Sequence, residues 1–308
     1  MFGSGKFLSA QVNSGRINTV YALSYSDPYY TVDGVSRGFD LYKRDTDASK
    51  LTIGPYKTKT VGGGVRWSYP LAERDSISFG LNAENVELST FTTSPTSYVN
   101  FVRSFGNNYT YMAGSVGWAR DSRDSLILPR EGSLQKVTAE VGVGDLEYYR
   151  LGYQHQFFRP LTRTLTMFLN GDIGYADGFG GKPLPFFKNF YAGGPGSVRG
   201  YNFSSLGAQD SFGNVLGGTR RLVGQAELLF PVPGAGQDKS LRLAAFVDGG
   251  QVFTAGQSID FAALRYSTGL ALTWSSPFGP LRLSMAQPLN RTATDRVQRL
   301  QFTFGTGF

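Results

Sequence analysis

The sequence contains no cysteine and a single histidine, His155, among its 308 residues. The lack of cysteine excludes disulfide bonds, thiolate nucleophiles and cysteine metal sites, and one histidine excludes most histidine metal sites. In its predicted strand, His155 shares the apolar face with Tyr153 and Phe157, a position that does not suit a catalytic base. Because the sequence offers no other nucleophile–base pair, we expect no enzyme, no metal and no cofactor.

Long apolar runs and charged residues are also scarce. No stretch approaches ~18 consecutive apolar residues, which excludes a helical membrane protein. Charged residues make up 17% of the chain, and the formal net charge of +7 is spread over it rather than clustered. Since no basic stripe is interleaved with base-stacking aromatic residues, we expect no nucleic acid partner.

What is present is alternation of apolar and polar residues. The period of two recurs through the whole chain, broken by turn residues, and helical periodicity is nowhere convincing. Forty glycines without a collagen period suit close-packed strands and turns. The pattern predicts an all-β chain with fourteen strands, at roughly 6–12, 17–26, 35–43, 57–69, 75–87, 108–120, 133–143, 147–158, 164–175, 221–230, 240–250, 263–274, 280–287 and 296–307.

Large apolar residues occupy one face of these strands and small or polar residues the other. By itself this pattern also fits a soluble sandwich. Three features favour an antiparallel transmembrane β-barrel: runs of about ten residues, which can cross a bilayer, aromatic residues near the ends of the runs, and alternation of short and long connections. We therefore expect residues 1–308 to form one barrel domain, with the C-terminus at the periplasmic rim.

A Gly-rich segment at 176–220 has no period of its own. It carries several large aromatic rings between residues 185 and 204, too many for a solvated linker. We expect this segment to be an extracellular loop that folds back into the lumen of the barrel, with Arg199 as its polar anchor.

Two acidic residues are candidate partners of Arg199. Alternation in the two strands that follow the loop directs Glu227 and Asp248 inward. The planar guanidinium group can bind carboxylates through two parallel hydrogen bonds, so we predict that Arg199 pairs with both acids. Spacing alone leaves the alternative open that Arg199 is exposed and that the acids are ordinary lumen charges.

Two motifs resemble the BamA family of outer-membrane barrel assembly factors. They are VRGY at residues 198–201 and F-x-D-x-G at residues 246–250, and the similarity extends over essentially the whole chain. The family implies a sixteen-stranded barrel that follows periplasmic POTRA domains. We therefore expect fourteen of sixteen strands here, in a piece of a longer chain that lacks the POTRA domains and the first two strands.

The resemblance also implies site residues. It assigns the lumen loop motif to Val198, Arg199, Gly200 and Tyr201, its acidic partners to Glu227 and Asp248, and the strand motif to Phe246 and Gly250. The last strand is expected to kink at a glycine and to pair weakly, which creates a lateral seam formed by Leu300, Phe302, Phe304, Gly305 and Phe308.

The function that the resemblance implies is insertion and folding of β-barrel proteins in the bacterial outer membrane through this seam. The implied partners are nascent outer-membrane barrels, outer-membrane lipid with lipopolysaccharide, and accessory lipoproteins that bind through POTRA domains. A protein-secretion pore of the same superfamily, of the two-partner secretion type, is the alternative. It would require a conductive lumen with a movable plug.

Overall fold

The computed structural model describes residues 5–51, 53–234, 240–277 and 279–305. Fourteen antiparallel strands form one sheet in which each strand pairs with its neighbours in sequence order, apart from the two shortest strands, β10 and β15. The sheet strands are β1 (Phe7–Ser14), β2 (Asn18–Asp27), β3 (Ser36–Asp47), β4 (Tyr56–Ala72), β5 (Asp75–Thr90), β6 (Asn108–Asp121), β7 (Gly132–Gly144), β8 (Tyr148–Pro160), β9 (Thr166–Gly178), β11 (Arg220–Pro231), β12 (Leu241–Phe253), β13 (Arg265–Ser276), β14 (Gly279–Pro288) and β16 (Leu300–Phe304).

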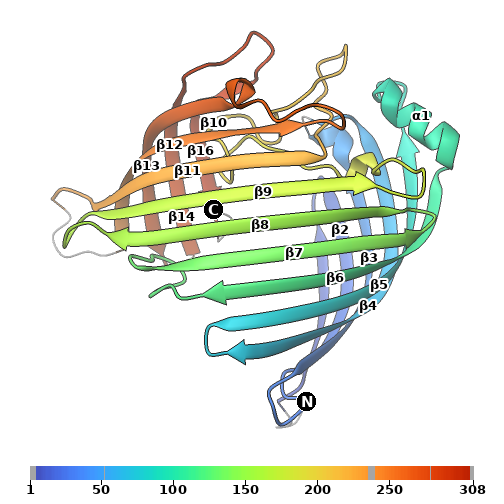
Figure 1. Ribbon diagram of the computed structural model, residues 1–308, viewed down its shortest axis with the longest axis horizontal. Helices are drawn as coiled ribbons and strands as arrows, with labels where there is room; N and C mark the ends of the chain where they lie inside the picture. Colours follow the sequence, from blue (N-terminus) through green and yellow to red (C-terminus); the bar gives the residue numbers. More distant parts are fainter. Residues whose placement is uncertain (1–4, 52, 235–239, 278, 306–308) are drawn as a thin grey trace.

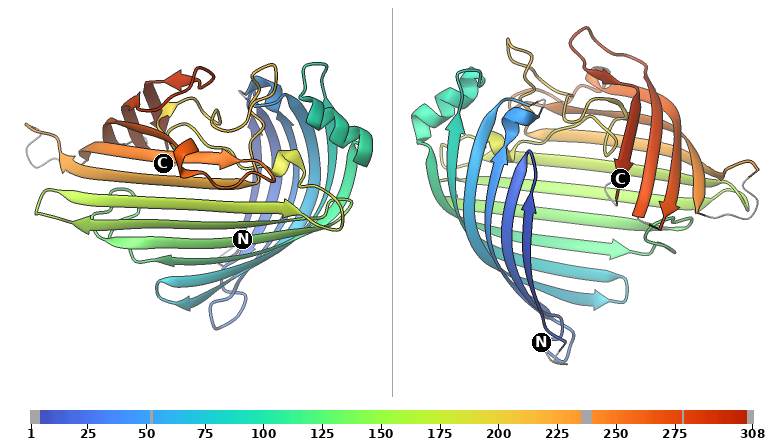
Figure 2. Two further views of the ribbon diagram at one scale, coloured as in Figure 1. Left: turned by 45° about the horizontal axis from the view of Figure 1, so that its top comes forward. Right: turned by 180° about the vertical axis from the view of Figure 1, so that it is seen from behind.

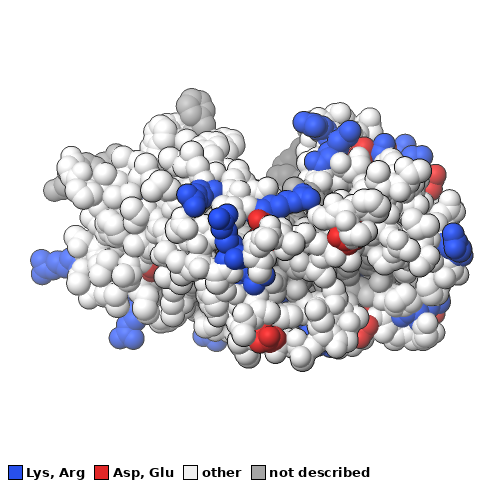
Figure 3. Space-filling view, turned by 90° about the horizontal axis from the view of Figure 1, so that it is seen from above, with Lys and Arg blue, Asp and Glu red and all other residues white. Residues whose placement is uncertain are grey.

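The predicted class, an all-β antiparallel transmembrane barrel, is confirmed. The sheet curls around a central lumen, and the edge strands β1 and β16 lie on the same side of the molecule (Figures 1 and 2). Within the described ranges, no ladder joins β1 to β16. Outward side chains are apolar and exposed, for example Leu41 on β3 and Leu270 on β13. The surface in Figure 3 is mostly uncharged, and Lys and Arg are more frequent on it than Asp and Glu.

One predicted strand, at 296–307, is divided in the structure. Val297–Gln298 form the short strand β15, which leaves β14 and pairs instead with β10, Gly200–Tyr201. The sheet resumes at β16, which pairs with residues 281–285 of β14. The uninterrupted strand was a wrong expectation because the last segment has two partners, and one of them lies in a loop far away in sequence.

The structure also contains a helix that the sequence did not indicate, since helical periodicity was nowhere convincing. Helix α1 covers Thr96–Phe105 in the connection between β5 and β6. Its apolar residues Tyr98, Phe101, Val102 and Phe105 recur at helical spacing, but in a segment rich in Ser, Thr and Asn. A helix this short is marginal in isolation and is stabilised by packing. Among the described residues, no helix has the length and apolarity needed to cross a membrane.

The connection between β9 and β11, residues 179–219, is called the lumen loop below. It begins at the end of the barrel that carries α1, as the antiparallel strand order requires, and passes between the walls of the barrel (Figure 1). The main buried cluster joins side chains of this loop, such as Phe186 and Leu206, to inward residues of the strands and to Tyr98 of α1. Three-residue 3-10 helices occur at Ala48–Lys50, Phe186–Lys188 and Phe261–Ala263.

Candidate functional site: the lumen loop and its anchors

The centre of the site is Arg199, whose side chain is 1% exposed. Its Nε and Nη2 atoms donate to the two oxygens of Asp248 at 2.6 and 2.5 Å, and its backbone N–H donates to the same carboxylate at 3.0 Å. Its Nη1 lies 2.7 Å from Oε1 of Glu227. The structure thus places the three predicted residues in direct contact, with the carboxylates coming from β11 and β12.

The strand motif on β12 shapes the seat for this arginine. Alternation along β12 directs Phe246, Asp248 and Gly250 into the lumen, where all three are buried. The ring of Phe246 lies under the Arg199 guanidinium group, with the Cζ atom 3.5 Å from the ring centroid. A cation in this position is attracted by the face of the ring. Phe246 and Asp248 therefore bind the same guanidinium group from different directions.

Two glycines provide the space that the loop needs. A Cβ atom on Gly250 would lie 2.9 Å from Val198 Cγ2, so this position leaves room for the fully buried Val198. Gly200 has φ +88°, a left-handed conformation that side chains rarely adopt. A Cβ there would lie 3.1 Å from the Cβ of Ala286 on β14. The VRGY and F-x-D-x-G motifs are therefore sterically complementary.

Arg282 on β14 is a site residue that sequence reasoning missed. Its Nη2 donates to both oxygens of Glu227 at 2.7 Å. The cluster of Arg199, Arg282, Glu227 and Asp248 has two positive and two negative side chains and is formally neutral. Alternation gives a signal for Arg282, because it lies between the outward residues Leu281 and Leu283.

Tyr201 and Gln301 connect the loop motif to the last strand. The Gln301 side chain donates from Nε2 to the Tyr201 carbonyl at 2.7 Å and accepts from the Gly200 N–H at 3.3 Å. The Tyr201 hydroxyl donates to the Tyr266 carbonyl of β13 at 3.3 Å. Gln301 was not predicted as a site residue, although it faces inward among the outward residues of β16.

The predicted seam residues lie on β16 and just beyond it. Leu300, Phe302 and Phe304 point outward and are 61–63% exposed. Gly305 follows the end of the strand with φ +94°, and its N–H donates to the Pro280 carbonyl at 2.8 Å. Phe308, the remaining predicted seam residue, lies outside the described residues.

Aromatic stacking fixes the outer part of the lumen loop. The Phe186 ring stacks on Tyr98 of α1, with centroids 3.7 Å apart and planes 7° apart, and both side chains are buried. Phe186 also makes an edge contact with Tyr56 on β4. Such aromatic pairs stabilise packing beyond their buried area. Helix α1 therefore packs on the loop, and this packing explains why a short segment rich in Ser, Thr and Asn forms a helix there.

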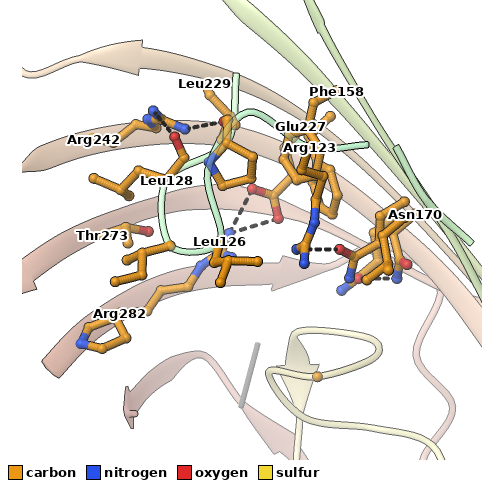
Figure 4. Close-up of a pocket in the computed structure, with 18 of the residues that line it drawn as sticks. Arg123, Leu126, Leu128, Phe158, Asn170, Glu227, Leu229, Arg242, Thr273 and Arg282 are labelled. Atoms are coloured by element: carbon orange, nitrogen blue, oxygen red, sulfur yellow. Dashed lines mark hydrogen bonds and ion pairs between the residues drawn. The ribbon is translucent and has the colours of Figure 1, made fainter. Parts of the chain in front are cut away.

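At the opposite end of the barrel, the connection 122–131 closes the lumen. Arg242 on β12 donates to the carbonyls of Leu128 and Pro129 at 3.1 and 2.7 Å, so this segment reaches across the barrel (Figure 4). Burial alone would raise the pKa of Asp124, but the backbone N–H groups of Arg130 and Glu131 donate to its carboxylate and lower the pKa below its ordinary value. These contacts give the segment a fixed conformation.

Between this closing segment and the tip of the lumen loop lies a cavity of about 440 Å³. Glu227 and Arg282 line it on one side, and Arg123 and Asn170 on another (Figure 4). Within the described ranges, no group of three or more His, Asp or Glu side chains is placed to hold a metal ion. The buried ion pairs of Arg199 hold the lumen loop against β11 and β12 and can therefore fix its position in the barrel.

Comparison with known proteins places this geometry in a family context. The model of the Omp85 superfamily domain matches residues 1–308. The chain is 38% identical, over its full length, to 44% of the outer membrane protein assembly factor BamA of Neisseria meningitidis. It is 26% identical to 39% of the BamA protein of Nitratidesulfovibrio vulgaris. The chain thus spans less than half the length of these curated relatives.

Solved structures show the same fold. A BamA structure from Haemophilus ducreyi that lacks POTRA domains 1–3 matches with a TM-score of 0.90 and 27% identity, covering 97% of this chain and 64% of that one. CdiB from Acinetobacter baumannii matches with a TM-score of 0.57 and 16% identity, covering 92% and 49%. The CdiB similarity concerns the fold alone.

Proposed function

Because the chain belongs to the Omp85 superfamily over its whole length, we propose that it inserts and folds β-barrel proteins in the bacterial outer membrane. The observation that carries the proposal is the match to BamA proteins, at 38% sequence identity in one case and a TM-score of 0.90 in another. The activity makes and breaks no covalent bond. It needs an edge at which an incoming strand can pair.

The proposed edge is the last strand. β16 has only five residues and pairs with β14 on one side, and Gly305 bends the chain directly after it. An exposed strand edge presents free N–H and C=O groups that template another strand. A nascent barrel strand would add to this edge by β-augmentation, and the outward Phe302 and Phe304 would meet lipid.

The proposed role of the lumen loop is to hold this part of the barrel in place. The loop is held by its motif residues Val198, Arg199, Gly200 and Tyr201. These bind or pack against the strand residues Phe246, Gly250, Glu227 and Asp248. We treat residues 1–308 as one barrel domain in which residues 176–220 form the lumen-inserted part; β9 extends to Gly178, so the connection itself begins at residue 179.

The proposed location is the bacterial outer membrane, with the C-terminal end of the barrel facing the periplasm and the α1 end facing outward. The proposed partners are nascent outer-membrane barrel proteins, outer-membrane lipid and lipopolysaccharide. Accessory lipoproteins are proposed to associate through POTRA domains. These assignments follow the family and apply to the full natural polypeptide.

A secretion pore is the competing proposal, and the described lumen weighs against it. The lumen loop and the segment 122–131 both lie in the lumen, and both are bound to β12, the loop through Arg199 and Asp248 and the segment through Arg242. A pore would need both segments to withdraw. An assembly factor needs movement at the lateral edge and in the part of the loop that contacts it, while the segment 122–131 can stay in place.

Grafting tests the proposal. Residues 1–308 replace the matching barrel segment of the Neisseria meningitidis relative, in cells depleted of their own copy. We expect the graft to restore insertion of a reporter barrel, measured as its heat-resistant folded band. The unaltered relative is the positive control. If the graft folds and conducts ions steadily in planar bilayers but does not insert the reporter, the barrel-insertion proposal is wrong and the secretion pore is favoured.

A further inference from the structure

The last strand of the sheet is joined directly to the backbone of the lumen loop. Gln301 is 3% exposed, and its amide bonds both the carbonyl of Tyr201 and the N–H of Gly200. A carboxamide carries a donor and an acceptor side by side, so it can pair with a peptide group much as a neighbouring strand does. Both polar groups of this side chain are thus used on the loop.

The backbone before Gln301 makes the same connection. Gln298 and Val297 of β15 pair with Gly200 and Tyr201 of β10. Just beyond this pair, the Asn202 N–H donates to the Arg296 carbonyl at 2.9 Å. Residues 296–298 therefore run beside the loop motif before the chain enters the sheet at Leu300.

Lateral pairing of the last strand is correspondingly short. β16 pairs with residues 281–285 of β14, whereas β11 pairs with β12 along its whole length, residues 220–231. In the described part of the chain β16 has no second neighbour in the sheet. The contacts to the lumen loop are therefore a main restraint on the position of β16.

We propose that Gln301 is a positioning residue that couples the lumen loop to the last strand. While Arg199 keeps the loop seated, the Gln301 amide holds β16 in register beside β14. When the loop withdraws, the amide loses its partners and β16 is released for pairing with an incoming strand. The release step rests on the proposed barrel-insertion function, whereas the coupling itself does not.

Another inward residue of β16 provides a matched control. Thr303 lies two positions further on, and its hydroxyl donates to the Arg282 carbonyl of its own hairpin at 3.5 Å. Replacement of Thr303 by valine keeps the shape of the side chain and removes a polar group from the lumenal face. It leaves the bonds between Gln301 and the loop intact.

Amide hydrogen exchange in the full natural polypeptide, reconstituted in lipid, tests the coupling. In Gln301→Leu we expect exchange over residues 297–304 to rise about tenfold, the factor that corresponds to ~1.4 kcal/mol and to one net hydrogen bond. Residues 220–231 should be unaffected. Exchange equal to that of Thr303→Val would overturn the proposal.

A covalent link separates coupling from simple packing. The 308 residues contain no cysteine, so Tyr201→Cys with Val297→Cys introduces a single cysteine pair within these residues, at positions that face each other across β10 and β15. In the Gln301→Leu background, oxidation should return exchange over residues 297–304 to its slow value, and reduction should raise it again. Fast exchange that persists in the oxidised protein would show that Gln301 does not act through the loop.

Reporter insertion tests the release step in the same samples. We expect the oxidised link to slow insertion of a reporter barrel at least about tenfold, a change of ~1.4 kcal/mol, with recovery on reduction. Equal insertion in both redox states would overturn the release step. If the unaltered protein inserts no reporter, the proposed function fails, while the exchange measurements still decide the role of Gln301.

Discussion

Replacement of Arg199 by alanine tests the buried ion pairs most directly. The change removes the cation that contacts both carboxylates. Glu227 keeps Arg282, whose Nη2 lies 2.7 Å from each oxygen. Among the described residues, Asp248, whose side chain is 0% exposed, then keeps only the backbone N–H of residue 199 as a partner. One carboxylate is therefore left buried without a cation, which typically costs about 3–5 kcal/mol.

The loss is measured as the temperature at which the folded band disappears on semi-native gels. We expect Arg199→Ala to unfold at a clearly lower temperature than the unaltered protein. Loss of the cation–π contact with Phe246 acts in the same direction. Reversing the charge at Asp248 should lower the transition as well, because it places two cations together.

A second lumenal arginine provides the control. Arg221 binds Asp172 at 2.6 Å, but their side chains are 29% and 24% exposed. Solvent screens such a pair, so Arg221→Ala should cost at most about 1 kcal/mol. If Arg199→Ala and the Asp248 charge reversal both unfold at the same temperature as Arg221→Ala and the unaltered protein, Arg199 is not an anchor of the loop.

Two further substitutions test the shape of the lumen. Gly250→Ala places a methyl group against Val198 and should cost about 1–3 kcal/mol by overpacking, which lowers the unfolding temperature on the same gels. Gly224→Ala is the control, because an added Cβ there meets nothing within 4 Å. Equal unfolding temperatures of the two variants would contradict the close fit between Gly250 and Val198. Arg242→Ala removes two bonds to the closing segment 122–131 and should weaken its docking by about 2 kcal/mol, which raises trypsin cleavage after Arg130 about 30-fold. Lys136→Ala is the control, because Lys136 lines the same cavity. If Arg242→Ala is cleaved no faster than Lys136→Ala, Arg242 does not hold the segment.

The sequence by itself determined the strands and the faces of their side chains. Alternation is a local property, because successive side chains of a strand point to opposite faces. It directed Glu227 and Asp248 inward and Phe302 outward without knowledge of any neighbour. Alternation and the aromatic content of the loop left the placement of Arg199 between both acids open, and the resemblance of the VRGY and F-x-D-x-G motifs to the family favoured it.

Only the tertiary structure decided which inward residues meet across the lumen. Arg282 contacts Glu227 and Gln301 contacts Tyr201, although 55 and 100 positions separate the members of these pairs. Such contacts depend on the curvature of the sheet and on the path of the loop, neither of which is encoded by a local period. For the same reason the helix α1, the closing segment 122–131 and the division of the last strand emerged only when the chain was folded.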